Sequence, residues 1–283
     1  ALALRCRPKR IWLPFYICAE MSDSLTSAGI ELCRYRIDRS LGVVRDFSLG
    51  REDWLLCVNY FGVADAVVDE ALKNFPEDRV VVDQAQAFFS PPRPALATVY
   101  SPRKFFGVPD GGYLITEIPV PEPLEQDEGS AERSGPLRIR RLEGAEAGYG
   151  AYRAAEAGLK GQPPRAMSSL TRGLLAGIDY PAARSRRIKN FRHLHERLGK
   201  SNRLRFSIAA DIAPLCYPYL PDDGNALRQR LLARRIYTPV YWPGLVRQSD
   251  PLGAEMAEGL LPLPIDQRYG EEEMENMLEV LFQ

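Results

Sequence analysis

A run of β-branched residues in the first third of the chain is the feature that most limits its fold. The segment RVVVD (79–83) is apolar at its three central positions and ends on a carboxylate. A continuous apolar run is typical of a strand buried on both faces, as in a parallel sheet, whereas a half-exposed strand alternates apolar and polar residues. Parallel strands are joined by crossover connections that usually contain a helix. The run therefore predicts an α/β fold with helices on both faces of a mostly parallel sheet.

The segments around this run alternate between strand and helix patterns. Residues 64–75 have apolar side chains at the spacing of an amphipathic helix, and we expect another helix to end near residue 28. The segments that read as strands are 10–14, 31–38, 54–62, 79–83, 95–101 and 112–120. This alternation predicts a large α/β domain over residues 1–135.

A polar, proline-containing segment separates this domain from a more helical second half. Residues 121–136 (PEPLEQDEGSAERSGP) contain five acidic residues and three prolines, which is typical of a solvated linker. Beyond it, apolar residues recur at helical spacing, and only 203–209 (RLRFSIA) reads as a strand. We therefore predict a smaller C-terminal α+β domain over residues 136–277, so that the whole chain resembles a large sheet domain followed by a small one.

The two ends of the chain carry their own signals. The last six residues, LEVLFQ (278–283), resemble the remnant of an engineered protease site, so we expect them to lie outside the fold. The first six, ALALRC, lack an initiator methionine and read as the interior of a helix. We therefore expect further residues before Ala1 in the complete protein.

Composition excludes several classes of protein. Lysine plus arginine equals aspartate plus glutamate, 37 each, which disfavours a nucleic-acid coat or a polybasic membrane binder. No apolar stretch approaches the roughly 20 residues that span a bilayer. The five dispersed cysteines fit reduced thiols in a cytoplasm, and two histidines offer little for a metal site. We expect a soluble, cytoplasmic, metal-free protein.

Three polar side chains are expected to meet at one edge of the predicted sheet. Asp83 lies at the carboxyl end of a buried strand, where open α/β sheets have their ligand crevice. Gln86 follows three residues later, and Lys104 follows the next predicted strand. A carboxylate at that depth is costly unless a cation meets it. The order of these residues predicts one shared pocket, although a single loop lysine is more often simply solvated.

Pyridoxal phosphate is a ligand that uses these three groups together. A carboxylate such as Asp83 keeps its ring nitrogen protonated, which makes the ring an electron sink. Gln86 can hydrogen-bond the ring hydroxyl, and Lys104 can bond covalently to the aldehyde and later act as base and acid. We expect Phe105 and Phe106 to lower the pKa of Lys104. Glycines in the 107–112 loop would let the backbone pass close to the ring.

These segments resemble the DegT/DnrJ-type sugar aminotransferases, a family of fold-type-I pyridoxal-phosphate-dependent enzymes. The likeness is carried by VNYFG (58–62), VVVDQAQAFF (80–89) and KFFGVPDGGYLIT (104–116), and it extends over nearly all of residues 1–277. The resemblance implies a homodimer with active sites at the subunit interface. It also implies a keto sugar nucleotide as the acceptor and glutamate, or a similar amino acid, as the amino donor.

The resemblance also assigns cofactor contacts near the lysine. The family's phosphate-binding Gly-Ser/Thr turn would precede Ala1. The family's serine five positions before the lysine is replaced by Val99, so Ser101 is the nearest hydroxyl and the expected contact. The separation of Asp83 from Lys104 is short for the family.

Two further cofactor contacts follow from the resemblance. Ser169, in the run Ser-Leu-Thr-Arg, stands where the family has an asparagine that reaches the cofactor phosphate of the partner subunit. An aromatic residue after Pro14 would stack on the cofactor ring. Tyr16 is the expected residue, with Phe15 as the alternative.

Three other features allow more than one interpretation. Tyr241 and Trp242, in a proline-bounded segment, either line the substrate pocket or pack in the core. Residues 184–205 carry nine lysines and arginines against one acid, which indicates either the wet face of a helix or a field that steers an anionic substrate. Cys18 and Cys57 lie in apolar surroundings and are expected to be inert packing.

The sequence therefore supports three hypotheses. The first is a pyridoxal-phosphate-dependent aminotransferase that acts on a keto sugar nucleotide in amino-sugar biosynthesis. The second keeps the cofactor and changes the reaction to other chemistry on an amino acid. The third is a homologue that binds ligands without turnover.

Overall fold

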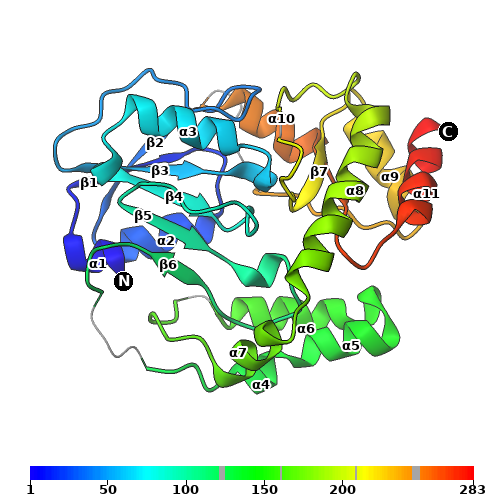
Figure 1. Cartoon of the computed structure of the whole chain (residues 1–283), viewed down its shortest axis with the longest axis horizontal. Coiled ribbons are helices and arrows are strands. Elements are labelled where there is room, and N and C mark those ends of the chain that lie inside the picture. The colour runs from blue at the N-terminus through cyan, green and yellow to red at the C-terminus, as the bar shows by residue number, and fades with distance from the viewer. Residues whose placement is uncertain (121–124, 160, 208, 244–248) are drawn as a thin grey trace.

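A six-stranded sheet forms the first half of the protein (Figure 1). The computed structural model describes residues 1–120, 125–159, 161–207, 209–243 and 249–283. The strands of this sheet are β1 (Arg10–Pro14), β2 (Glu31–Tyr35), β3 (Asp53–Val58), β4 (Val80–Gln84), β5 (Ala97–Tyr100) and β6 (Tyr113–Ile115). Their order across the sheet is β2-β1-β3-β4-β5-β6.

The pairing of these strands confirms the predicted α/β class. Strands β1 to β5 are parallel to one another, and β6 alone runs antiparallel to β5. All six residues of β3 are buried, and Val80 and Val82 in β4 are fully buried. The β-branched run thus forms a strand in the middle of the sheet, covered on both faces.

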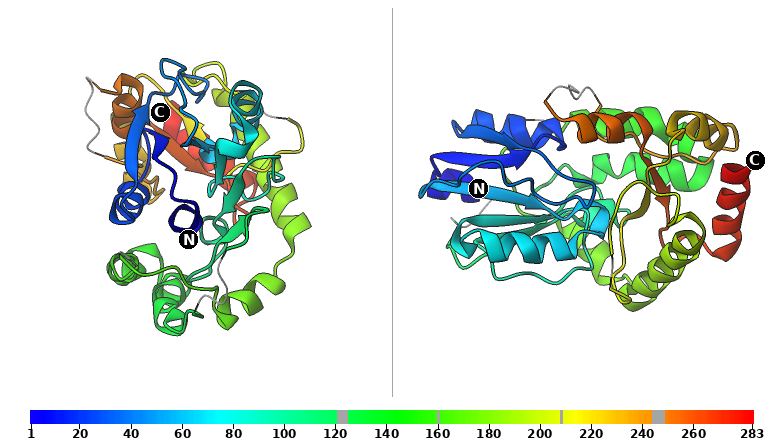
Figure 2. Two further views of the ribbon diagram at one scale, coloured as in Figure 1. Left: turned by 90° about the vertical axis from the view of Figure 1, so that its left-hand side faces the viewer. Right: turned by 90° about the horizontal axis from the view of Figure 1, so that it is seen from above.

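Helices cover both faces because the crossovers leave in opposite directions. Helix α1 (Leu2–Cys6) precedes β1, α2 (Ala19–Ser27) joins β1 to β2, and α3 (Asp65–Asn74) connects β3 to β4. The first crossover moves to one side of β1 and the second to the other side of β3. Right-handed crossovers therefore place α2 and α3 on opposite faces, as Figure 2 shows.

The second half of the chain is mainly helical and contains a small antiparallel sheet. Figure 1 shows α4 to α7 beneath the six-stranded sheet and β7, α8, α9 and α11 beside it. No helix in the described ranges is both long and apolar enough to cross a bilayer. The elements are α4 (Ser130–Arg133), α5 (Gly135–Glu143), α6 (Ala145–Ala157), α7 (Ser169–Ala176), α8 (Tyr180–Leu198), β7 (Cys216–Tyr219), α9 (Gly224–Ala233), α10 (Pro251–Gly259), β8 (Leu261–Pro264) and α11 (Glu271–Phe282).

The structure corrects two predictions in this half. The segment 203–209 forms no strand in its described residues; the small sheet pairs β7 with β8 instead. The expected linker 121–136 is already helical at α4 and the start of α5, and Arg133 forms an ion pair with Asp127. Its residues 121–124 lie outside the described residues. The division into domains at residue 135 stays a prediction.

The carboxyl-terminal residues belong to the fold. Leu278, Val280 and Leu281 lie on α11 and are at most 7 % exposed, in the same hydrophobic core as residues of β1, β3 and β7. The expectation that residues 278–283 lie outside the fold is therefore wrong. Their apolar side chains complete the face of α11 that packs against α8 and α9.

Candidate active site

The carboxyl ends of β1, β3, β4 and β5 lie at one edge of the sheet. The strand order reverses between β1 and β3, and an open sheet leaves a ligand crevice outside the strand ends at such a switch point. Four residues are placed at or just after these ends. They are Cys18 after β1, Asn59 after β3, Asp83 in β4 and Lys104 after β5.

Asp83 and Lys104 interact electrostatically at this edge. Asp83 is 8 % exposed, and its carboxylate accepts a hydrogen bond of 2.8 Å from the backbone N–H of Ala85. Burial raises the pKa of Asp83, while that N–H and the positive charge of Lys104 act in the opposite direction. The structure thus brings the predicted acid and amine within electrostatic range of one another.

The surroundings of Lys104 differ from the prediction. Lys104 ends a short 3₁₀ helix, η3 (Pro102–Lys104), and its side chain is exposed. Phe105 and Phe106 are buried and pack with Phe88 and Phe89 in a separate aromatic cluster. The expected desolvation of the amine by these two rings is therefore wrong. Their role is to anchor the loop that carries the lysine.

Gln86 is held by an unusual turn and keeps one free donor. Its Oε1 accepts a hydrogen bond of 2.8 Å from the N–H of Phe61 in η1 (Tyr60–Gly62). Phe61 and Gly62 have φ of 57° and 72°, and a Cβ on Gly62 would lie 2.9 Å from the carbonyl oxygen of Gln86. The Nε2 of Gln86 is buried without a hydrogen-bond partner among the described residues. A buried unpaired donor costs about 1–3 kcal/mol, so it marks a place for a ligand acceptor.

Cys18 lies after β1 near the candidate site and packs against the hydrophobic core, as predicted. It precedes α2 and is half-buried. Burial raises the pKa of the Cys18 thiol, and the charges of Lys104 and Asp83 both act on it. Cys57, in contrast, is fully buried within β3, as expected of packing.

The aromatic residues expected to contact cofactor or substrate form one cluster. Tyr16 is completely buried, 4.5 Å from Trp242 and 5.8 Å from Tyr60 between ring centroids. No face of the Tyr16 ring is open, so the expected stacking of Tyr16 on a cofactor is not what this conformation allows. Tyr241 and Trp242 are half-buried, and Tyr241 lies 5.7 Å from Phe61. Both therefore pack on the core beside the η1 turn that holds Gln86.

The Asp-Gly-Gly sequence after the lysine anchors a helix. The buried carboxylate of Asp110 accepts hydrogen bonds from the N–H of Ser168 (3.0 Å), the hydroxyl of Ser168 (2.7 Å) and the hydroxyl of Thr171 (2.8 Å). Gly111 has φ of 101°, and a Cβ there would lie 2.9 Å from Met167. The glycine thus allows the loop to pass α7. The expectation that Gly111 serves passage of the backbone close to a cofactor ring is not supported.

Ser101 and Ser169 are the two serines that were predicted to contact the cofactor. Ser101 precedes η3, and its side chain makes no capping hydrogen bond there. Ser169 is the exposed first residue of α7, with its Oγ 2.7 Å from the side-chain amide of Gln126. The role of Ser169 toward a partner subunit stays a prediction.

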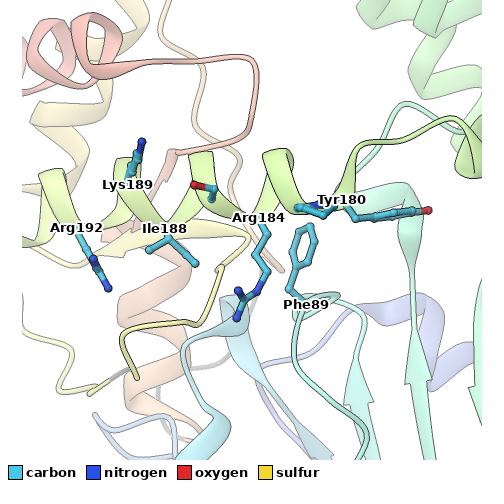
Figure 3. A pocket seen from close by; sticks show the side chains of 8 residues that line it. Phe89, Tyr180, Arg184, Ile188, Lys189 and Arg192 are labelled. Carbon is cyan, nitrogen blue, oxygen red and sulfur yellow. The ribbon is translucent and has the colours of Figure 1, made fainter.

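Arg187, in the basic segment 184–205, is buried. It therefore belongs neither to a solvent-exposed helix face nor to a surface field that steers a substrate. Between α8 and the loop after β4, a cavity of about 500 Å³ is lined by residues that include Phe89, Tyr180, Arg184 and Ile188. Figure 3 shows Arg184, Ile188 and Arg192 on one side of the helix and Lys189 on the other. Arg184 pairs with Asp211 at 3.2 Å, so part of the charge near this cavity is already neutralised.

The fold of the chain is similar to that of solved DegT/DnrJ/EryC1/StrS aminotransferases and sugar aminotransferases. No protein-family model and no curated protein matches the chain, but solved structures of this class do. An aminotransferase named for that family, from Brucella abortus, is 14% identical and has a TM-score of 0.60, with 97% of this chain and 79% of that chain covered.

Two further solved structures match over almost the whole chain. The putative sugar aminotransferase Spr1654 from Streptococcus pneumoniae, in its PMP form, is 14% identical with a TM-score of 0.66, covering 99% of this chain and 83% of that one. DesV from S. venezuelae, in complex with a ketimine intermediate, is 18% identical with a TM-score of 0.62, covering 99% and 80%. At these identities the likeness shows the fold, and it confirms the predicted fold-type-I architecture.

Proposed function

We propose that this protein is a pyridoxal-phosphate-dependent aminotransferase that moves an amino group from glutamate, or a similar amino acid, to a keto sugar nucleotide. The observation that carries the proposal is the electrostatic interaction between the buried carboxylate of Asp83 and the exposed amine of Lys104, at the edge where the parallel strands of a doubly wound sheet end. The structural neighbours support it, since they include sugar aminotransferases, one of them solved in PLP and PMP forms.

The residues present fit pyridoxal phosphate. Asp83 is a buried carboxylate whose pKa is raised by burial, and a protonated ring nitrogen would supply the missing charge. The buried Nε2 of Gln86 needs an acceptor, which the ring hydroxyl would provide. Lys104 offers an exposed amine for covalent attachment to the aldehyde.

Each of these side chains would have a distinct task in the reaction. When bound, pyridoxal phosphate supplies an electron sink for the charge that develops on the substrate carbon. Asp83 would hold a proton on the ring nitrogen. The Nζ of Lys104, once free, would take the proton from the substrate carbon and return it to a carbon of the cofactor. Gln86 would fix the ring orientation through one hydrogen bond.

We propose further that two copies associate, that Ser169 faces the partner's cofactor, and that the enzyme works in the cytoplasm. Apolar side chains exposed on β6 and α7 support association. All five cysteines are free, which suits a reducing compartment.

Covalent trapping tests the proposal directly. The protein is incubated with pyridoxal phosphate, reduced with borohydride, digested and mapped by mass spectrometry. We expect the cofactor on Lys104, in the unaltered protein and in the control Lys189→Ala, and neither modification nor turnover in Lys104→Ala. In a separate sample that is not reduced, glutamate alone should convert the bound cofactor to pyridoxamine phosphate in one turnover, and a keto sugar nucleotide should reverse this.

Two results would contradict the proposal in different ways. Trapping at Lys104 without pyridoxamine phosphate from any amino donor would indicate other chemistry on an amino acid. Absence of trapping at Lys104 would indicate a homologue that binds without turnover.

A further inference from the structure

Arg187 in α8 is a buried cation close to the lysine loop. It is 1 % exposed, and its guanidinium lies 4.6 Å from the centroid of the Phe105 ring. Its hydrogen bonds go to neutral acceptors: Nε to Gln267 Oε1 (3.0 Å), and Nη1 to the carbonyls of Pro214 (3.2 Å) and Leu215 (3.0 Å). Burial lowers the pKa of Arg187 to about 10, so it stays charged at neutral pH.

The remaining donor of Arg187 reaches the residue that follows Lys104. Its Nη2 donates to the carbonyl oxygen of Phe105 at 3.4 Å, and Gln267 Nε2 donates to the same oxygen at 3.0 Å. Two side chains from the second half of the chain therefore hold one carbonyl next to the lysine. Gln267 itself is fixed by its bond to Arg187, so the two act as a pair.

The same guanidinium is connected to the other side of the crevice. The N–H of Leu215 donates to the carbonyl of Phe61 at 2.8 Å, and the N–H of Phe61 donates to Gln86 Oε1. A continuous chain of contacts thus runs from the Lys104 loop through Arg187 and residues 214–215 to Gln86. It joins the two segments that carry the predicted cofactor contacts.

A cation is a costly choice for a purely structural position. A buried charge has a large desolvation penalty, and apolar residues of similar volume are often at least as stabilising. The planar fork of arginine can satisfy several acceptors at fixed angles, which the point charge of lysine does not reproduce. We therefore explain the arginine at position 187 by the fixed geometry of its hydrogen bonds and not by a contribution to stability.

We propose that Arg187 is a positioning residue, which acts with Gln267 through the Phe105 carbonyl to hold Lys104 toward the crevice of Asp83 and Gln86. This inference rests on the proposed function, because it assigns Lys104 the covalent bond to the cofactor. It adds residues of α8 and of the segment before α11 to a site otherwise built from the first 104 residues.

Comparison of two cofactor forms tests the inference. Pyridoxal phosphate bonds to Lys104, whereas pyridoxamine phosphate has no aldehyde and cannot. We expect Arg187→Lys to weaken binding of pyridoxal phosphate about tenfold, the cost of roughly one to two lost hydrogen bonds, and to change binding of pyridoxamine phosphate less than twofold. Arg186→Gln, on the exposed side of the same helix, should change neither affinity. Both are measured by isothermal calorimetry.

Gln267→Ala keeps the inference testable if Arg187→Lys does not fold. Gln267 is half-buried and uncharged, and its loss removes one donor to the Phe105 carbonyl. Gln267→Ala should likewise weaken the binding of pyridoxal phosphate more than that of pyridoxamine phosphate, and it should slow borohydride trapping at Lys104.

The contrary outcomes separate this inference from the proposed function. Equal weakening of both cofactor forms, or no change in either, would show that Arg187 and Gln267 only support the fold. In those cases the unaltered protein still binds pyridoxal phosphate at Lys104, and the proposed function stands. If the unaltered protein binds neither form, the proposed function fails and the inference fails with it.

Discussion

Asp83 occupies a position where an ionised carboxylate is unfavourable without a ligand. The side chain is nearly enclosed, and the amine that opposes its burial belongs to an exposed residue, Lys104. Because burial raises the pKa of Asp83, the ionised carboxylate destabilises the folded protein at pH values above that pKa. The destabilisation decreases as pH falls through the raised pKa and is lost below the ordinary pKa of an aspartate. Functional sites often retain such locally unfavourable groups.

We therefore expect Asp83→Asn to stabilise the ligand-free protein at pH 7 while it slows the reaction. Asparagine can still accept the hydrogen bond from Ala85, but carries no charge. Its thermal midpoint should exceed that of the unaltered protein at pH 7, with the gap closing as pH falls toward about 4. Turnover should fall by about 10²-fold or more, in the range that loss of proton control costs. A variant with lower stability at pH 7, or with unchanged turnover, would refute this role for Asp83.

The sequence predicts some residues of the site better than others. Asp83, Gln86 and Lys104 could be placed because each lies at or shortly after the carboxyl end of a strand, and these strand ends meet at one edge of a parallel sheet. The positions of Tyr16 and of the phenylalanines after Lys104 could not be predicted, since the direction of a loop side chain depends on distant packing partners. Arg187 was hidden among exposed arginines with the same local pattern.

At the scale of elements, the loop after the lysine is fixed by its attachment to α7. The two carboxylate oxygens of Asp110 accept three hydrogen bonds from residues at the start of this helix. Asp110→Ala should therefore lower the free energy of unfolding by about 1–3 kcal/mol, measured in urea, because buried donors lose their acceptor. Hydrogen exchange should accelerate in residues 168–176. Asp110→Asn, which retains one acceptor oxygen, is the matched control and should lose less; equal exchange in all three proteins would contradict the assignment.

The strands show why sequence patterns succeed in one half and fail in the other. Long apolar runs in β3 and β4 identify buried central strands. The short strands β7 (CYPY) and β8 (LPLP) contain prolines, which normally argue against a strand. They are tolerated because a two-stranded sheet has only edge strands.

At the scale of the whole molecule, one hydrophobic core joins the two halves, and apolar side chains of β6 and α7 form an open surface. The core includes Leu55 of β3, Tyr217 of β7 and Leu281 of α11. Only the full set of long-range contacts shows that the last residues of the chain belong to it. The open surface consists of Tyr113, Leu114 and Ile115 in β6 and Leu170 and Leu174 in α7, each 38–48% exposed.

This surface predicts self-association. Gly112 and Tyr113 line the same cavity as Arg172, Leu175 and Ala176, so β6 and α7 lie next to one another. A stable interface buries about 800 Å² on each partner, and burial of this apolar face would favour it by about 25 cal/mol per Å². We expect a dimer in sedimentation velocity at micromolar concentration, and Leu174→Asp and Ile115→Asp should each shift it to monomer. Leu232→Asp, equally exposed on α9, should remain dimeric. A monomeric unaltered protein, or equal dissociation of the α9 variant, would show that this face is not the interface.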